Sequence, residues 1–435
     1  MTEHFREVYA GKPETKLRKK PNGKSIETTV LLGAWLGVVE ENSDGWIKVK
    51  AFGKEGWVHE AQDTRKDMGL KVFFVDVGQG DACFIETQDK RILVDGGPNS
   101  NFKNYLTKWK YKWLLKAGYR VRFDAVFVSH FDADHFAGLT KIIKDDRFEI
   151  GAVYHNGIAR FHSQRKERLE KYDTDLGRTN AHGQSNVDRE FLKTSFSTIN
   201  DAKNLLSESP GQKGLVKSFK QFLEAMVEAK EKNRMGTMKR LTVRDGHVPG
   251  FGPNSGLEIQ VLGPVPTHNS RLYHFAWFKD SSHTRNGHSL VLKVIYKNRS
   301  LLLGGDLNTY SERYLIDYYS PDNPFEVDAA KACHHGASEF TVDFMKAVRP
   351  YATVFSSGDN ENYAHPRADA LGCAGKYGRG TRPLVFSTEL ARSISSADDI
   401  HYGLINLRTD GEQMMLAHML EKKRPSDIWD SYILP

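Results

Sequence analysis

The pattern of apolar and polar positions changes near residue 70. Before it, residues 27–59 run as short apolar stretches broken by glycine-containing turns at 43–46 and 53–58. This spacing predicts short antiparallel strands joined by tight turns, as in a small β-barrel. Residues 60–69 are polar and are expected to form a linker. A first domain, linker included, is therefore expected to span 1–68.

After residue 70 the apolar runs become nearly continuous. The runs KVFFVDVG, ACFIET and RILVDGG end in Gly, Asp or Thr, and they are typical of strands buried on both faces of a sheet. Residues 102–117 have apolar positions at helical spacing, and residues 125–130 again have the pattern of a strand. The order β–β–β–α–β predicts a mixed sheet covered by helices. Later strands are expected at 257–263, 288–296, 300–304, 329–333 and 352–356, with a final hairpin around 402–418.

One stretch, residues 159–249, breaks this rhythm. It is polar, rich in Lys and Arg, and largely helical in its pattern. We interpret it as a basic insertion that covers the sheet near its loops, within a second domain spanning 69–435. A solvated helical face explains its charge more simply than a specific nucleic-acid contact does.

Composition narrows the class of protein only slightly. With 435 residues, of which 39% are apolar, the chain is long enough for two or more globular cores. It contains no run near the roughly 20 apolar residues of a membrane span and no secretory signal, so we expect a soluble, cytoplasmic protein with no membrane partner. Three cysteines without close pairing argue against a disulfide framework or a thiolate zinc site. The net charge of +7 fits a polyanionic partner but does not require one.

Residues capable of binding a metal are concentrated in the segment SHFDADH at 129–135. Four such side chains fall within six residues, directly after an apolar strand: His130, Asp132, Asp134 and His135. A strand end presents a short loop whose side chains can converge on one point. Imidazole and carboxylate together suit Zn²⁺, Mn²⁺ or Fe²⁺. The segment therefore predicts a metal site.

A site built on this segment needs ligands from later strand ends. The run LLLGGDL supplies Asp306 after two glycines, where a carboxylate could bridge two ions. The run KACHHGAS supplies His334 and His335, and GHSLVLKV supplies His288 at the start of a strand. Two ions about 3.5–4 Å apart could hold a bridging hydroxide next to a phosphoryl or acyl oxygen.

The order of these motifs resembles the metallo-β-lactamase superfamily, and more narrowly the soluble hydrolase domain of the ComEC family of DNA-uptake proteins. The resemblance covers about residues 70–420 apart from the insertion, and it rests on VDVGQGDACFIE, LVDGGP, SHFDADHFAGL, NGHSLVLKV, LLLGGD, CHHGAS and SSGDNENYAHP. It implies an α/β fold, the αββα sandwich of that superfamily. Upstream, a GWIKV strand followed by GWV resembles bacterial SH3-like domains. That second resemblance implies a β-barrel that binds peptides, cell-wall fragments or a neighbouring domain.

The first resemblance also implies how the ligands divide between two ions. His130 and Asp132 would bind one ion and Asp134 and His135 the other, with Asp306 bridging them. The commoner superfamily pattern is HxHxDH, so Asp132 replaces an imidazole here, as it does in ComEC-like chains. A carboxylate at this place should make the site harder and more tolerant of Mn²⁺.

Three histidines are assigned less firmly by the resemblance. His334 would complete the second ion's ligands, with His335 as the alternative from the same motif. His288 is the weakest assignment, because ComEC-like chains often carry Asn in this loop and Asn286 stands two residues earlier. The ion beside His130 would then be loosely held or exchangeable.

Further side chains are expected to support the ligands. Asp95, in LVDGG, should accept a hydrogen bond from a ligand imidazole and so fix its tautomer. Gln79 and Asp81 lie in and just after a glycine turn, and we expect them to shape the loop beside the site. His365, in NYAHP, could protonate a leaving oxygen or hold a phosphate, and it could equally serve to fix its own loop.

Together these features predict a metal-dependent phosphodiester hydrolase, with DNA or RNA as the favoured substrate. A hydroxide bridging two ions, Zn²⁺ or Mn²⁺, would attack, Asp134 would orient it or take its proton, and His365 would assist the leaving group. Nucleic acid is the expected partner, and a protein could bind through the SH3-like barrel. Two alternatives stay open: a hydrolase of a small phosphodiester or other small substrate, and a metal-stabilised binding or scaffold protein.

Overall fold

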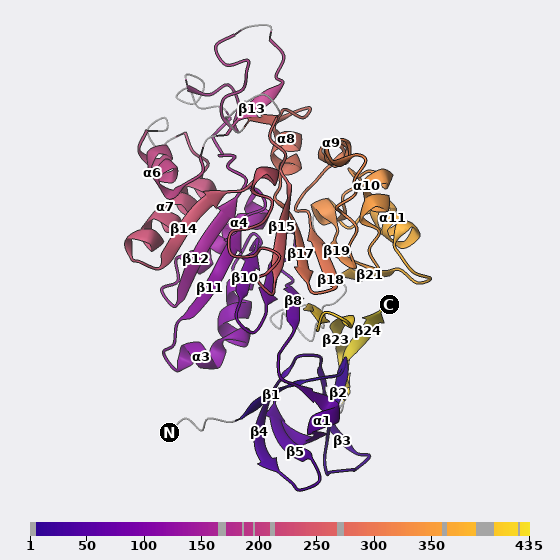
Figure 1. The fold of residues 1–435 in the computed structure, drawn as a ribbon. Coiled ribbons are helices and arrows are strands. Elements are labelled where there is room, and N and C mark those ends of the chain that lie inside the picture. The colour runs from indigo at the N-terminus through magenta and orange to yellow at the C-terminus, as the bar shows by residue number, and fades with distance from the viewer. Residues whose placement is uncertain are drawn as a thin grey trace.

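The computed structural model describes residues 6–163, 171–184, 187–194, 196–208, 214–267, 274–358, 363–388, 404–424 and 427–435. A curled N-terminal sheet lies next to a sandwich of two larger sheets that carries helices on its outer faces (Figure 1). Among the described helices, none is long and apolar enough to cross a membrane.

The N-terminal sheet consists of seven short antiparallel strands in the order β3-β2-β6-β5-β4-β1-β7. Gly45 and Gly53 stand in two of its turns, each with φ 76°, a conformation that glycine adopts without strain. The turn expected at 43–46 is confirmed, whereas the one expected at 53–58 is shorter, because residues 54–58 belong to β6. The SH3-like assignment stays a prediction. Apolar side chains such as Leu17, Val49 and Val58 form a small core of its own. The elements are β1 Glu7–Ala10, β2 Glu14–Arg18, β3 Ile26–Leu31, β4 Trp35–Glu41, β5 Trp46–Ala51, β6 Lys54–His59, α1 Glu60–Asp63 and β7 Thr64–Arg65.

The first sheet of the sandwich has nine strands in the order β14-β12-β11-β10-β9-β8-β22-β23-β24. Its strands β10, β11, β12 and β14 are parallel to one another, and the rest pair antiparallel. The expected β–β–β–α–β order is confirmed, because helical segments separate β10 from β11. The strands are β8 Leu70–Phe74, β9 Cys83–Glu86, β10 Arg91–Val94, β11 Val121–Phe127, β12 Phe148–His155, β14 Met235–Arg240, β22 Ile405–Thr409, β23 Met414–Arg424 and β24 Asp427–Leu434.

The second sheet has six strands in the order β15-β17-β18-β19-β20-β21. The strand expected at 288–296 begins only at Val291, because helix α8 runs to Gly287 just before it. The strands are β15 Glu258–Gly263, β17 Val291–Tyr296, β18 Arg299–Leu303, β19 Ala329–Lys331, β20 Ala352–Phe355 and β21 Leu384–Ser387. Two short strands, β13 Phe191–Lys193 and β16 His274–Ala276, form a separate pair.

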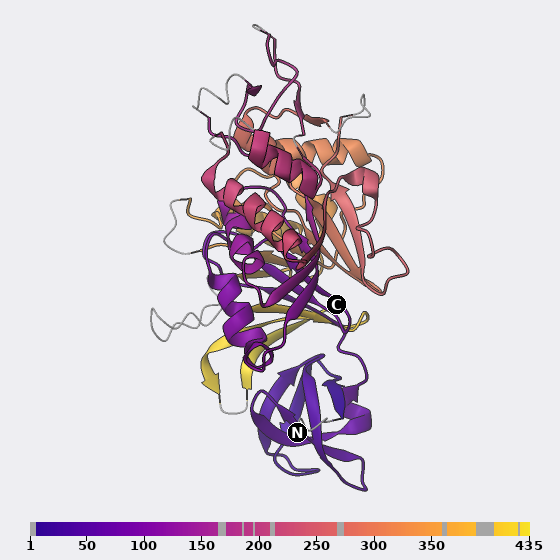
Figure 2. The same ribbon diagram turned by 90° about the vertical axis from the view of Figure 1, so that its left-hand side faces the viewer.

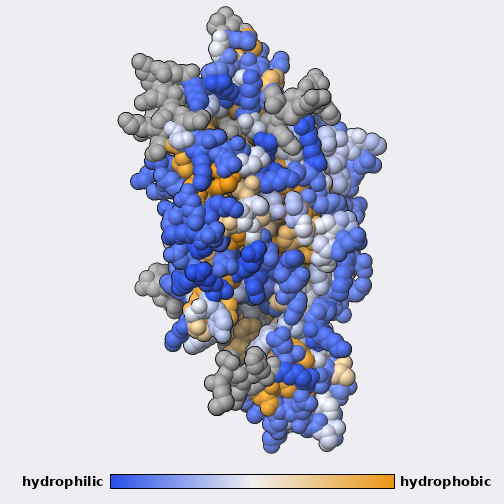
Figure 3. Space-filling model, turned by 60° about the vertical axis from the view of Figure 1, so that its left-hand side comes forward, coloured by the Kyte–Doolittle hydropathy of each residue, from blue (hydrophilic) through white to orange (hydrophobic). Residues whose placement is uncertain are grey.

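Four layers result, because apolar side chains fill the space between the sheets and helices cover both outer faces. One core lies between the two sheets, a second under α4 and α7, and a third under α9 and α10. The face turned forward in Figure 3 is largely hydrophilic, with small hydrophobic areas between polar ones. The helices are α2 Asn101–Asn104, the π-helical η1 Tyr105–Lys110, α3 Lys112–Lys116, α4 Ala133–Ile143, α6 Ile199–Glu208, α7 Lys217–Glu231, η3 Val243–Asp245, α8 Ser281–Gly287, α9 Thr309–Tyr319, η4 Cys333–Gly336, α10 Val342–Val348 and α11 Ala368–Tyr377.

The described residues of 159–249 form strands as well as helices. Helices α6 and α7 are present, and α7 packs Phe219 and Phe222 against Phe131. Strand β14, in contrast, lengthens the nine-stranded sheet by pairing in parallel with β12. This stretch therefore builds an edge and part of the outer helical layer of the sheet.

The hairpin of β23 and β24 connects the N-terminal sheet to the sandwich, as its yellow ribbon shows in Figure 2. Leu31 and Leu32 pack against Met415 and Trp429. Arg408, in β22, donates from Nη1 to the carbonyl oxygens of Leu31 at 3.3 Å and Leu32 at 2.8 Å. Apolar contact and charged hydrogen bonds thus join the two parts.

Candidate metal centre

The loop between β11 and α4 presents the first candidate ligands at the end of a buried strand. Helix α4 lies unusually close to the loop after β10: a Cβ at Gly138 would lie 1.9 Å from the carbonyl oxygen of Gly96. Gly138 N also donates to Gly97 O at 2.8 Å. This close approach fixes the start of α4 and with it four side chains: His130, Asp132, Asp134 and His135.

Three of the candidate ligands converge on one point, His135, His335 and Asp306, and Asp134 lies beside His335. His135 Nε2 is 3.3 Å from His335 Nε2 and 3.2 Å from Asp306 Oδ1. His335 Nε2 is 3.3 Å from Asp306 Oδ2 and 3.4 Å from Asp134 Oδ2. Asp134 is partly exposed and the other three are buried. Two imidazoles and two carboxylates are a suitable set of ligands for Zn²⁺ or Mn²⁺.

Outer hydrogen bonds orient both imidazoles toward this point. His335 Nδ1 donates to the carbonyl oxygen of Ser356 at 2.9 Å, and His135 Nδ1 donates to Asp95 Oδ2 at 2.8 Å. Asp95 also accepts from Ser129 N at 2.8 Å, so its position is fixed as well. In neutral rings bonded in this way, Nε2 carries the lone pair. Two such lone pairs facing each other at 3.3 Å call for a cation between them.

The surrounding charges favour positive charge at the same point. Burial alone would lower the pKa of His135 and of His335, but Asp306 together with Asp95 or Asp81 raises both well above their usual value. Burial would raise the pKa of Asp306, but the two histidines hold it well below its usual value. The centre therefore takes up a proton or another cation readily.

Asp81 lies behind the histidines. Its Oδ1 is 3.2 Å from His335 Nδ1 and its Oδ2 is 3.8 Å from His135 Nδ1. Lys331, buried in β19, forms an ion pair with Asp81 and lies 3.8 Å from Asp306 Oδ1. Asp81 is near enough to count among possible ligands, but its oxygens face the Nδ1 atoms and an ammonium group. We therefore assign it a supporting position, as the sequence suggested.

His130 and Asp132 form a second group next to the first. His130 Nε2 is 3.8 Å from Asp132 Oδ2 and 4.0 Å from Asp306 Oδ2. The other oxygen of Asp132, Oδ1, pairs with Arg160 and Arg285. Asp306 Oδ2 is therefore near both His130 and His335, so Asp306 is the carboxylate that the two groups share.

Buried polar atoms without a hydrogen-bond partner mark the same places. Within the described part of the chain they include His130 Nε2, Asp306 Oδ1, Asp81 Oδ1 and His334 Nδ1. Leaving such an atom unsatisfied costs about 1–3 kcal/mol. Ions held by the two groups would satisfy His130 Nε2 and Asp306 Oδ1, so the residues present fit divalent metal ions.

The neighbouring histidines of the HHG motif take different places. His335 faces His135, whereas His334 Nε2 lies 3.9 Å from Asp306 Oδ2 and its side chain is 23% exposed. The structure therefore brings His335 rather than His334 to the His135 group and leaves His334 beside Asp306. Both adopt left-handed backbone conformations, with φ 48° and 54°, which are uncommon for residues other than glycine and concentrate at functional sites.

His288 is not brought to the cluster, in contrast to its assignment from the sequence. Its Nε2 donates to the carbonyl oxygen of Ala276 at 2.7 Å. Its ring stacks on Phe275 and on Phe278, each at a centroid distance of 4.7 Å. A ring with its Nε2 engaged in this way inside an aromatic stack serves packing.

His365 and Gln79 lie together beside the histidine pair. Gln79 Nε2 is 3.1 Å from His365 Nδ1. The ring centroid of His365 is 6.0 Å from that of His334 and 6.3 Å from that of His335. Both residues therefore border the candidate centre.

Three charged residues at the centre were not singled out from the sequence: Lys331, Arg160 and Arg285. A lysine inside the apolar run AAKAC, three positions before the histidine pair, is the one signal that could have drawn attention to Lys331. Arg160 and Arg285 reach Asp132 from separate segments of the chain, and no local pattern distinguishes them.

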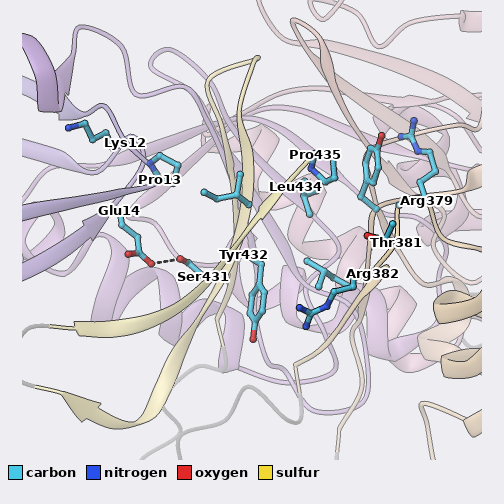
Figure 4. Close-up of a pocket in the computed structure, with 14 residues that line it drawn as sticks. Lys12, Pro13, Glu14, Arg379, Thr381, Arg382, Ser431, Tyr432, Leu434 and Pro435 are labelled. Atoms are coloured by element: carbon cyan, nitrogen blue, oxygen red, sulfur yellow. Dashed lines mark hydrogen bonds between the residues drawn. The ribbon is translucent and has the colours of Figure 1, made fainter.

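A cleft of about 730 Å³ lies elsewhere, between the N-terminal sheet, the C-terminal strands and β21 (Figure 4). None of the candidate ligands lines it, and its polar side chains include Lys12, Glu14, Arg379, Arg382 and Tyr432. The candidate site is therefore identified by the geometry of its ligands and not by the size of a cavity.

One family model and several solved structures are similar to this chain. Residues 75–195 match the family model of the Metallo-beta-lactamase superfamily. Among solved structures, the chain is similar to Tm1679, a metal-dependent hydrolase of the beta-lactamase superfamily, with 13% identity over 78% of this chain and 99% of that one and a TM-score of 0.35. The search of curated proteins finds no match.

Two further solved structures show a similar degree of likeness. Igni18, a metallo hydrolase from the archaeon Ignicoccus hospitalis, has 14% identity over 72% of this chain and 96% of its own, with a TM-score of 0.32. A diphosphatase from the PhnP family has 10% identity over 73% and 94%, with a TM-score of 0.32.

The segment that matches the family model holds Asp81, Asp95 and the whole of SHFDADH. Around it, two stacked sheets carry helices on both outer faces. The buried Asp and His side chains converge where β11 ends and α4 begins. The family match over residues 75–195, this layering and this cluster together support a metallo-β-lactamase fold.

Proposed function

We propose that the protein is a metal-dependent phosphodiester hydrolase that acts on nucleic acid, as a nuclease for DNA or RNA. One observation carries the proposal: His135, Asp306 and His335 meet in a buried cluster, and two arginines border it through Asp132. Two divalent ions, Zn²⁺ or Mn²⁺, would supply an acidified water and a Lewis acid for a phosphoryl oxygen. Guanidinium groups suit a phosphate, because their N–H groups bind its oxygens in pairs.

The chain's own side chains would handle protons around the reacting phosphate. Asp134 is partly exposed, with 32% of its side chain accessible, so it can accept a hydrogen bond from a water and then its proton. His365 has Nδ1 beside Gln79, so its Nε2 would donate to the leaving oxygen. These roles for Asp134 and His365 are part of the proposal.

The proposal extends to the rest of the chain. We place the hydrolase within residues 69–435, similar to the ComEC-like branch, and an SH3-like module within residues 1–68. The module's curled sheet and separate core support this division. We further propose that the module binds a protein partner and that the protein acts in the cytoplasm.

A hydrolysis assay across metals and substrates tests the function. The purified protein, with Mn²⁺ or Zn²⁺, should cleave single- or double-stranded DNA or RNA. An Asp132→Ala, Asp134→Ala double variant should fold but lose both bound metal and hydrolysis. Replacement of the exposed Asp322 by Ala is the matched control and should leave both unchanged.

Other outcomes separate the alternatives. If the protein cleaves bis(p-nitrophenyl) phosphate but no nucleic acid, it is a metal-dependent hydrolase of small phosphodiesters and not a nuclease. Metal uptake with no hydrolysis of either substrate would favour a binding or scaffold protein. A chain that takes up no divalent metal would remove the basis of the proposal.

A further inference from the structure

Asp132 differs from the other candidate carboxylates in its partners. Its Oδ1 pairs with Arg160 and lies 2.5 Å from Arg285 Nε, while its Oδ2 faces His130. Arg160 also donates to the carbonyl oxygen of Phe131 at 2.8 Å, so the backbone holds it in place. The two arginine side chains are 18% and 13% exposed, which keeps both charges mostly away from bulk water.

The two groups of ligands therefore stand in different electrostatic surroundings. Around His135 and His335 lie four carboxylates and one ammonium group, that of Lys331, which contacts Asp81 and Asp306; the four are Asp81, Asp95, Asp134 and Asp306. Beside His130, the charges of Asp132 and of the shared Asp306 are opposed by two guanidinium groups. Because charges act strongly over a few ångströms in a buried site, a divalent cation is favoured at the first group and opposed at the second.

We infer that Arg160 and Arg285 make the two metal positions unequal, so that the position between His135 and His335 fills first and the one beside His130 and Asp132 fills weakly. The inference rests on the proposed function, since it concerns the same centre. The arginines act through Asp132: they occupy one of its oxygens and oppose the charge of an ion held by the other.

A phosphate group would change this balance. Arg160 and Arg285 meet at Asp132, whose side chain is 20% exposed and so lies at the border of the centre. A phosphate anion bound by the two guanidinium groups would offset their charge and remove the opposition to the second ion. Since such coupling is reciprocal, the second ion and the phosphate strengthen each other's binding. The centre is then complete only when a phosphate-bearing ligand is present.

Mn²⁺ titration of the full-length, chelator-treated protein tests the inference without any activity measurement. Equilibrium dialysis should show one Mn²⁺ bound tightly and a second with a Kd at least tenfold higher. In the Arg160→Gln, Arg285→Gln variant, the second Kd should fall at least tenfold toward the first. Electron paramagnetic resonance should then show the coupled Mn²⁺ pair at a lower Mn²⁺ concentration than in the wild type.

A second Mn²⁺ titration, in the presence of inorganic phosphate, tests the role of the anion. Phosphate should lower the second Kd of the wild type and leave that of the double variant unchanged. Arg147→Gln is the control, because Arg147 pairs with Asp145 on the surface and should not alter either Kd. Equal affinities in the wild type, or a ratio unchanged in the double variant, would overturn the inference.

A double variant that does not fold, and a wild type that binds no Mn²⁺, lead to different conclusions. Should the double variant fail to bind the first ion or to fold, the single Arg285→Gln variant must still narrow the ratio of the two Kd values, and an unchanged ratio there also overturns the inference. A wild type that binds no Mn²⁺ at either position contradicts the proposed function itself. Two ions bound with equal affinity would contradict the inference that the two metal positions differ, but not the proposed function.

Discussion

Asp95 controls the candidate centre without facing the point where an ion would lie. It accepts hydrogen bonds from Ser129 N and from His135 Nδ1, so it fixes both the loop and the tautomer of one ligand. Its own backbone is left-handed, with φ 56°, a conformation that Asp and Asn tolerate better than most residues. The residue can therefore be changed to Asn without disturbing the backbone.

Asp95→Asn should weaken metal binding about 10–100-fold, the usual effect of removing an outer carboxylate from a ligand histidine. Competition with a coloured chelator measures the loss. His288→Ala is the informative control: it should lower stability by opening the stack with Phe275 and Phe278 while leaving metal affinity unchanged. If the His288 variant lost metal while Asp95→Asn kept it, His288 and not Asp95 would be the residue that supports metal binding.

Glu312 carries a pH dependence that is separate from the centre. Burial raises its pKa to about 8, and it accepts a hydrogen bond from Thr341 N at the start of α10. In the unfolded chain the pKa of this group is about 4.3. Its favourable contribution to the free energy of unfolding is therefore complete below that pH and is lost progressively as the pH rises toward 8.

Glu312→Gln should keep the hydrogen bond to Thr341 and remove this loss. At pH 8 the free energy of unfolding of the variant should exceed that of the wild type by at least about 1.4 kcal/mol, the equivalent of one pKa unit. The difference should shrink as the pH approaches 4.5. Urea denaturation at several pH values measures it, and a difference independent of pH would contradict the explanation.

At the scale of elements, the position of α4 depends on a glycine. Helix α4 carries Asp134 and His135 in its first turn and approaches the loop after β10 at Gly138. Backbone hydrogen bonds hold the contact, from Gly96 N to His135 O at 2.6 Å and from Gly138 N to Gly97 O at 2.8 Å. The helix therefore transmits the packing at Gly138 to the ligands one turn earlier.

Gly138→Ala should destabilise the protein by about 1–3 kcal/mol or more, because overpacking forces the helix outward. It should also weaken metal uptake, which a chelator titration can follow. Gly372 in α11 is the matched control, because a Cβ there meets no atom within 4 Å. Gly372→Ala should leave uptake unchanged and stabilise the fold by about 0.5–1 kcal/mol. Equal effects of the two changes would rule out the contact as the cause.

The sequence predicted elements better than it predicted contacts between them. Continuous apolar runs identified β8 to β11, and the sequence also predicted that SHFDADH directly follows a strand. From the sequence alone, however, the roles of neighbouring side chains were harder to separate. The sequence could not distinguish His334 from His335, because a left-handed turn of the backbone decides which ring faces inward. His288 was misassigned because its ring is held by Phe275 and Phe278, whose positions depend on the fold.

For the whole molecule, Arg408 joins the N-terminal sheet to the sandwich. Burial lowers its pKa to about 10, and its hydrogen bonds to Leu31 and Leu32 compensate for the buried charge. Hydrogen bonds to charged groups are worth about 1.5–3 kcal/mol each. Removing this side chain should therefore loosen the joint while the centre stays intact.

Residues 60–65, expected to belong to a linker, form α1 and β7, so only residues 66–69 join the two parts. Arg408→Gln should speed protease cleavage within residues 66–69 and leave Mn²⁺ affinity unchanged. Arg408→Lys keeps the charge and one donor group, and its cleavage rate should be intermediate. Limited proteolysis followed by mass spectrometry measures the rates. A variant cleaved no faster than the wild type would show that the apolar contact of Leu31 with Met415 and Trp429 holds the joint alone.

The same joint sets an order for the chain's synthesis. Arg408 and Leu31 are 377 positions apart, so the N-terminal sheet leaves the ribosome long before its partner exists. At about 5–20 residues per second, the interval lasts roughly 20–75 s. During it, the apolar surface of Leu31 and Leu32 faces solvent or a chaperone. A nascent chain interrupted before β22 would keep that surface exposed, which gives the cell's quality control a means to recognise it.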